Sequence, residues 1–122
     1  MFIYPPDLTK HYGKVVDNGH CVRFAQAVVP GVPHTSHWRR GAKVRGGDIP
    51  PGAVIATFDA SGRYANAVDG SSHAAILLDE LEDGLLVADQ WVGQPVHERV
   101  IKYRGGSGLA VNDGDLFYVV ET

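Results

Sequence analysis

The stretch GSSHAAILLD, residues 70–79, indicates how this chain folds. Residues 74–78 are apolar at every position, so a strand over 73–79 has two apolar faces. Such strands lie in the middle of a sheet, with at least one face covered. A helix is predicted over residues 20–29, because apolar residues recur there at helical spacing before Pro30-Gly31. We expect this helix to cover the central strand.

Four further apolar runs predict the other strands of the sheet. Turn-forming residues such as Asp83-Gly84 bound these runs, which cover 53–58, 85–91, 98–103 and 116–121. With the helix before the strands, the predicted fold is α+β, an N-terminal helix packed on a mainly antiparallel five-stranded sheet. A second helix is predicted over residues 35–42, and Tyr4-Pro5-Pro6-Asp7-Leu8 is predicted to be extended. A length of 122 residues fits one domain, residues 1–122.

The composition excludes several classes of protein. The 11 Lys and Arg residues against 14 Asp and Glu residues give a formal charge of −3, so no nucleic-acid partner is expected. No apolar run exceeds five residues, so no membrane insertion is expected either. The first residues lack the basic start and the apolar core of a secretory signal. A single cysteine permits no internal disulfide.

Cys21, the single thiol, has the setting of a reactive cysteine. It follows Asn18-Gly19-His20 and opens the predicted helix, where free backbone N–H groups and the positive end of the helix dipole favour a thiolate. The alternative is a small buried apolar residue, which most lone cysteines are. A thiolate that cleaves amides also needs a base and a group that orients this base.

His73 is the best candidate for the base among the six histidines. It begins the buried run 74–78, at the rim of a strand whose remainder is core. His20 adjoins Cys21, but consecutive helical residues do not face one another. The other four histidines lie in polar or loop-like stretches. The alternative for His73 is a purely structural histidine at a strand edge.

The orienting group depends on the register between the strands 73–79 and 85–91. If Asp79 and Leu85 flank a five-residue loop, paired residue numbers sum to 164, and Asp89 is the diagonal neighbour of His73 on the same face. If the loop contains an even number of residues, every side chain of the second strand points to the opposite face of the sheet, and Gln90 takes the place of Asp89. Asp89 and Gln90 are therefore the two candidates.

These blocks resemble the papain-like NlpC and CHAP group of cysteine amidases and peptidases. The similar strings, spread over residues 10–103, are Gly19-His20-Cys21-Val22, Pro51-Gly52-Ala53-Val54-Ile55-Ala56, His73-Ala74-Ala75-Ile76 and Asp89-Gln90-Trp91. Two positions depart from the pattern, because His20 stands where CHAP proteins often have Gln and Trp91 where they often have Asn. The resemblance implies a papain-like fold and a cysteine hydrolase that cleaves amide bonds, commonly in peptidoglycan peptides, without a cofactor.

The mechanism implied by this resemblance is acyl transfer. Cys21 attacks the scissile carbonyl, His73 carries the proton to the leaving amine, and Asp89 holds the imidazole. The backbone N–H of Cys21 meets the developing oxyanion, with Asn18 or His20 as the candidate second donor.

Two tryptophans, Trp38 and Trp91, complete the candidates for substrate binding. The neighbouring basic residues have two interpretations, a groove for an acidic peptide or a solvated face; they are Arg39, Arg40, Lys43 and Arg45. Trp38 likewise has two interpretations, a residue of this groove or a partly buried core residue. A metal site is not expected. Among the cysteine and the histidines, only His34-x-x-His37 has a spacing that suits a metal, and this pair alone is a weak signal.

Small proteins of this pattern without a leader also resemble the amidase effectors of bacterial type VI secretion. The resemblance implies synthesis in the bacterial cytoplasm without a signal peptide, export to the periplasm of a target cell, and an immunity protein that plugs the cleft. Two alternatives stay open: a cytosolic cysteine peptidase, and a non-catalytic module of the same fold that binds peptides or cell wall.

Overall fold

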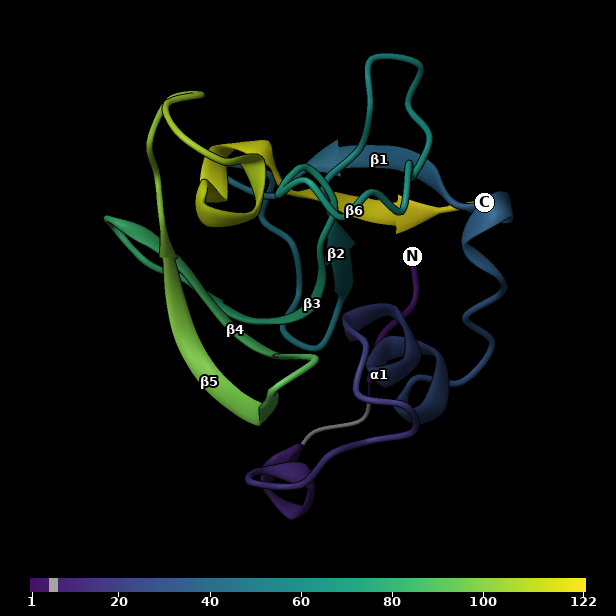
Figure 1. The fold of residues 1–122 in the computed structure, drawn as a ribbon. Coiled ribbons are helices and arrows are strands. Elements are labelled where there is room, and N and C mark those ends of the chain that lie inside the picture. Colours follow the sequence, from purple (N-terminus) through teal and green to yellow (C-terminus); the bar gives the residue numbers. More distant parts are fainter. Residues whose placement is uncertain (5–6) are drawn as a thin grey trace.

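One antiparallel sheet organises the fold in the computed structural model, which describes residues 1–4 and 7–122. The prolines of the extended segment predicted at Tyr4-Pro5-Pro6-Asp7-Leu8 lie outside the described residues. The prediction is wrong at its end, because Asp7 has a positive φ of +89° and Leu8 has helical backbone angles as the N-cap of the 3-10 turn Thr9–His11. In the described part, six strands follow the order β1-β6-β2-β3-β4-β5 (Figure 1). Their bounds are Arg39–Lys43 (β1), Val54–Ala56 (β2), Ala74–Glu80 (β3), Gly84–Trp91 (β4), Gln94–Lys102 (β5) and Tyr118–Glu121 (β6). The α+β class and the antiparallel sheet are confirmed, with six strands where five were predicted.

The helix α1, Cys21–Val28, covers the central strand β3 as predicted. Its inward residues Phe24 and Ala25 are fully buried, and burial of the Phe24 ring alone stabilises the fold by roughly 2–3 kcal/mol. Within the described residues, no helix has the length and the apolar character needed to cross a membrane.

The predicted second helix over 35–42 is wrong. A single 3-10 turn, η2, spans Thr35–His37, and β1 follows it along the edge of the sheet against β6. Gly41 explains the difference, because a Cβ atom at this position would come within 2.7 Å of the Val119 carbonyl oxygen. This glycine permits the close approach of two strands rather than the end of a helix.

Strand β5 begins at Gln94, four residues before the predicted start. Trp91 pairs with Gln94, so Val92-Gly93 form a two-residue turn, and Gly93 adopts the positive φ of +93° that such turns need. Pro95 is tolerated because β5 is an edge strand.

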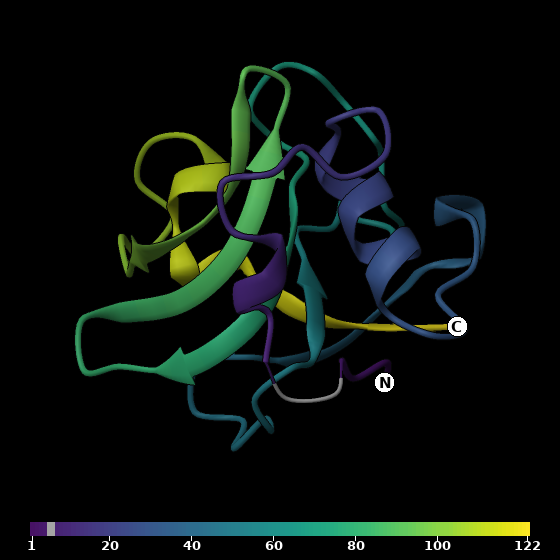
Figure 2. The ribbon, with the colours of Figure 1, turned by 90° about the horizontal axis from the view of Figure 1, so that it is seen from below.

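The two faces of the sheet carry separate apolar clusters. On the face covered by α1, Ala74, Ile76 and Ala88 pack with Phe24. On the other face, Leu77 and other apolar residues pack around Phe117, next to the 3-10 turns η3 (Ala110–Asn112) and η4 (Gly114–Leu116). Figures 1 and 2 both show α1 and these turns on opposite sides of the sheet. The chain ends lie close together, and the Met1 amino group contacts Glu121.

Candidate active site

Cys21 is the first residue of α1, as the sequence predicts. His20 is the N-cap residue, but its side chain makes no capping hydrogen bond. The turn before the helix is held instead by the Asn18 side chain, whose Oδ1 accepts from the backbone N–H of His20 at 3.1 Å, and Gly19 takes a φ of +87°. The thiol therefore sits at the positive end of the helix dipole, where a thiolate is favoured.

Gln90 holds this turn from the sheet. It is fully buried on β4, and its Nε2 donates to the carbonyl oxygens of Val16 at 2.8 Å and His20 at 3.0 Å. Its Oε1 accepts from the backbone N–H of Val16 at 2.9 Å. The side chain thus ties β4 to the loop that carries Cys21, and it does not contact His73 within hydrogen-bonding distance in the described structure.

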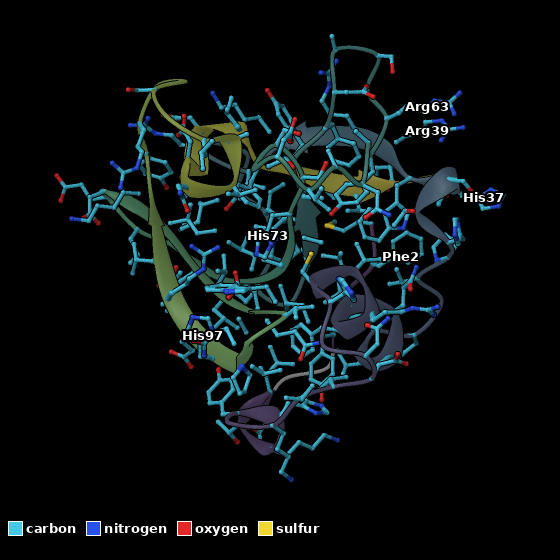
Figure 3. The ribbon with its side chains drawn as sticks, in the orientation of Figure 1. Phe2, His37, Arg39, Arg63, His73 and His97 are labelled. Atoms are coloured by element: carbon cyan, nitrogen blue, oxygen red, sulfur yellow. The ribbon has the colours of Figure 1, made fainter. Side chains whose placement is uncertain are left out.

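His73 and Asp89 form a buried hydrogen-bonded pair. His73 Nε2 lies 2.7 Å from Asp89 Oδ2, and the two residues are 6% and 0% exposed. The backbone N–H of His73 donates to Thr57 Oγ1 at 3.0 Å, which fixes the start of the strand. Figure 3 shows His73 between α1 and the β4–β5 hairpin. With Nε2 engaged by Asp89, Nδ1 is the ring nitrogen left to exchange a proton with the thiol.

A β-bulge sets the register that selects Asp89. Near the turn, Glu80 pairs with Leu85, so the paired residue numbers sum to 165 and the loop between them has an even number of residues. Between Leu77 and Asp79 the register shifts, and Ile76 pairs with Ala88 at a sum of 164. The register predicted around His73 is therefore the observed one, although the predicted five-residue loop is wrong.

The ionisation of Cys21 and His73 is coupled. Burial raises the pKa of the Cys21 thiol, but the His73 imidazole, the Ala74 backbone N–H and the Tyr64 hydroxyl outweigh burial, so this pKa lies below its ordinary value. Burial lowers the pKa of His73, but Asp89 and Cys21 outweigh it and raise this pKa to about 9. Both shifts favour a thiolate beside an imidazolium near neutral pH.

The Tyr64 hydroxyl is a further group at the thiol. It lies 3.9 Å from Cys21 Sγ, and the residue is 8% exposed. The ring packs 5.0 Å from the Trp38 ring, centroid to centroid. Burial, followed by the nearby Cys21 thiol, raises the pKa of the Tyr64 phenol, so the hydroxyl stays protonated and can donate to sulfur.

Asp89 also has two neighbours on β5, an arginine and a histidine. Arg99 Nε donates to Asp89 Oδ2 at 2.9 Å, and His97 Nδ1 lies 3.7 Å from Asp89 Oδ1. This Oδ1 is buried and has no hydrogen-bond partner among the described residues. The carboxylate charge is therefore compensated through Oδ2 by His73 and Arg99 together.

Two cavities meet at this site, and the predicted substrate-binding residues divide between them. Asn18, His20 and Cys21 line the first, of about 320 Å³. Trp91 lines the second, of about 370 Å³, together with His73. The assignment of Trp38 to substrate binding is wrong, and its alternative, a core residue, is the one observed, because this side chain is fully buried and its indole N–H donates to the Pro33 carbonyl oxygen at 3.1 Å.

The basic cluster lies away from the two cavities. Figure 3 shows Arg39 at the edge of the molecule, away from the centrally placed His73. Arg45 pairs with Asp115 at 2.8 Å, and Arg40 stacks over the Tyr118 ring at 5.4 Å. This arrangement agrees with a solvated face. In the described part of the chain, no three His, Cys, Asp or Glu residues are placed to hold a metal ion.

The sequence analysis did not predict Tyr64 or Arg99 at the site. It also did not predict that Gln90 holds the loop before Cys21. Arg99 could have been found, because on an antiparallel hairpin it shares a face with Asp89. Tyr64 lies in a long loop, and no periodicity indicates where its ring points.

Comparisons with known proteins agree with one another. A family model described as "Domesticated amidase effector 2" matches residues 3–120. A protein of that name from Ixodes scapularis is 42% identical over 90 residues, which cover 71% of this chain and 58% of that protein. The chain therefore spans less than two-thirds of this curated relative.

A solved structure gives the same result. "Type 6 secretion amidase effector 2 (Tae2)" matches with a TM-score of 0.73 and 33% identity, over 88% of this chain and 84% of that one. The resemblance to small type VI amidase effectors, predicted from the sequence, is thereby confirmed. Since the family model covers nearly the whole length, this chain is a member of the Domesticated amidase effector 2 family.

Proposed function

We propose that this chain is a cysteine amidase of papain-like architecture that cleaves amide bonds in peptidoglycan peptides, with residues 1–122 as one catalytic domain. The observation that carries the proposal is the arrangement of Cys21, His73 and Asp89, in which a thiol at a helix start interacts with an imidazole held by a buried carboxylate. Membership of an amidase effector family supports the reaction class.

The first half of the reaction forms a thioester. The Cys21 thiolate attacks the carbonyl carbon, and the carbonyl π electrons move to the oxygen. As the tetrahedral intermediate collapses, the C–N bond breaks and the His73 imidazolium gives its proton to the departing nitrogen. Asp89 keeps the imidazole oriented and stabilises its positive charge.

The second half restores the enzyme. His73, now neutral, removes a proton from water, and the resulting hydroxide attacks the thioester carbonyl. The C–S bond breaks, the acid product leaves, and the thiolate and the imidazolium re-form. Proton and charge therefore return to their starting positions after one turnover.

The oxyanion of both intermediates needs donors at the start of α1. The backbone N–H of Cys21 is one, because the first helical N–H groups have no partner within the helix. Asn18 is our second donor in preference to His20. Its Oδ1 is held by the His20 N–H at 3.1 Å, which fixes the amide plane while the Nδ2 group stays available, and Asn18 lines the cavity at Cys21.

The biological setting that fits this chemistry is antibacterial. The matched structure is named a type 6 secretion effector, which supports delivery of the amidase to the periplasm of a target cell, where peptidoglycan is accessible. Peptidoglycan is also present in the cell that produces the enzyme. We therefore propose an immunity protein as a partner, which covers the two cavities and protects the producer.

Digestion of purified peptidoglycan, followed by mass spectrometry of the fragments, tests the proposal. The wild type is expected to release peptides with one new amine and one new carboxyl end, and Cys21→Ala none. In a Gram-negative host, the wild type with a periplasmic signal is expected to cause lysis, whereas the same protein without the signal, or Cys21→Ala with it, causes none. A folded wild type that binds peptidoglycan but cuts no bond would favour the non-catalytic module.

A further inference from the structure

The guanidinium of Arg99 faces the cavity beside His73. This cavity of about 370 Å³ is lined by Arg99, Trp91, His73, Val68 and other residues of two loops. Arginine has five N–H donors, and the hydrogen bond recorded for this side chain uses Nε alone, toward Asp89 at 2.9 Å. Among the described residues the outer nitrogens have no hydrogen-bond partner. They are therefore available to a ligand.

Two contacts hold this guanidinium in place. The bond to the fully buried Asp89 fixes one edge, and the plane lies over the Trp91 ring at 5.1 Å. Arg99 is consequently pre-oriented before any ligand arrives, which reduces the entropy lost on binding. The fork of outer nitrogens has the geometry that a carboxylate fills with two parallel hydrogen bonds.

The position of this cavity relative to the scissile bond follows from the two halves of the site. The cavity at Cys21 includes Asn18 and His20 but not His73, so it receives the acyl part that becomes bonded to sulfur. The cavity at Arg99 includes His73 but not Cys21. Since His73 gives its proton to the departing nitrogen, the leaving part of the substrate lies on this side. Val68 borders both cavities, so they are neighbours on the surface of the protein.

Resting on the proposed amidase function, we infer that Arg99 binds a free carboxylate on the substrate residue that supplies the leaving amine. The site then selects amide bonds whose nitrogen belongs to a residue with an unblocked acid group. Trp91, which is 41% exposed, forms the wall against which this residue lies. Asp89 does not repel the ligand strongly, because His73 and Arg99 already share its charge.

The variant Arg99→Gln separates this role from the contact with Asp89. Glutamine places its amide nitrogen about where arginine has Nε, so it can still donate to Asp89 while the outer nitrogens and the charge are lost. The matched control is Arg40→Gln, which removes an arginine stacked over Tyr118 on the distant strand β1.

A binding measurement that needs no turnover is the first test. In the Cys21→Ala background, a leaving-side dipeptide with a free carboxylate is titrated against the same dipeptide as a carboxamide. The carboxylate form is expected to bind about 10-fold to 100-fold more tightly, the range of a charge-assisted contact, and Arg99→Gln is expected to abolish this difference. Arg40→Gln is expected to retain it. Equal binding of the two dipeptides, or a difference that survives Arg99→Gln, would overturn the inference.

Kinetics on intact substrates give the second test. For a substrate pair that differs in the same carboxylate and carboxamide, Arg99→Gln is expected to lower kcat/KM for the carboxylate form about 10-fold to 100-fold more than for the amide form. An equal loss on both substrates would mean that Arg99 acts through Asp89 alone. Carboxylate binding without any cleavage would instead refute the amidase function while leaving this binding site in place.

Discussion

Replacement of Gln90 by methionine tests how the loop of Cys21 is held. Methionine has nearly the same length and volume but cannot make the three hydrogen bonds to Val16 and His20, of 2.8 to 3.0 Å. At about 1 kcal/mol for each bond, Gln90→Met is expected to lower the free energy of unfolding by about 3 kcal/mol. For a chain of this size that corresponds to a fall in Tm of about 10 °C.

The assay combines thermal unfolding with activity below the transition. Turnover is expected to fall about 10-fold to 100-fold, because the start of α1 loses its anchor to the sheet and Cys21 is misplaced. The alkaline limb of the pH profile, which His73 sets, is expected to stay in place. Gln26→Met is the matched control, since Gln26 makes one hydrogen bond, to Pro33 at 3.1 Å, and its loss is expected to cost only about 1 kcal/mol.

Two results would refute this reasoning. A loss of less than about 0.5 kcal/mol for Gln90→Met would mean that the three bonds do not hold the loop. A shift of the alkaline limb comparable to that of Asp89→Asn would mean that Gln90 orients His73 after all.

Three further predictions concern the site itself. Asp89→Asn is expected to lower turnover by at most about 100-fold, far less than loss of Cys21. It is also expected to move the alkaline limb of the pH profile to lower pH, because the charge that raises the pKa of His73 is removed. An unchanged limb would exclude this electrostatic role. In the wild type, kcat/KM is expected to fall on the acid side as the thiolate is protonated, at a lower pH than an ordinary cysteine would set, because the pKa of Cys21 is lowered, and to fall above about pH 9 as the imidazolium loses its proton; a profile that keeps rising beyond pH 10 would contradict the ion pair. Tyr64→Phe is expected to slow alkylation of Cys21 at pH 7 by about fivefold through loss of one hydrogen bond, whereas an unchanged rate would exclude donation to sulfur.

The central layer of the fold could be predicted because its signals are local. The apolar residues 74–78 specify a buried strand, and the helical spacing after Cys21 specifies the helix that covers it. The edge strand β1 could not, because Arg39–Lys43 carries no apolar alternation and is held by pairing with the distant strand β6. Intrinsic propensity decides little where the partner strand lies about 80 residues away.

The predicted register at His73 is observed, but it depends on a β-bulge that the sequence does not indicate. The loop closes with an even count, which alone would place Gln90 beside the imidazole. The bulge between Leu77 and Asp79 adds one residue and returns Asp89 to that face. Nothing in the sequence of these residues marks the bulge. The sequence left two interpretations of Trp38 open, because its burial depends on contact with Tyr64, which is far along the chain.

The most direct test of the thiolate mechanism is the turnover of Cys21→Ala on an amide substrate that the wild type cleaves. Turnover is expected to fall more than about 1,000-fold, with a Tm close to that of the wild type, because the thiol sulfur forms the bond to the substrate and alanine fits its space. A folded Cys21→Ala protein that keeps turnover within about 10-fold of the wild type would contradict the thiolate mechanism.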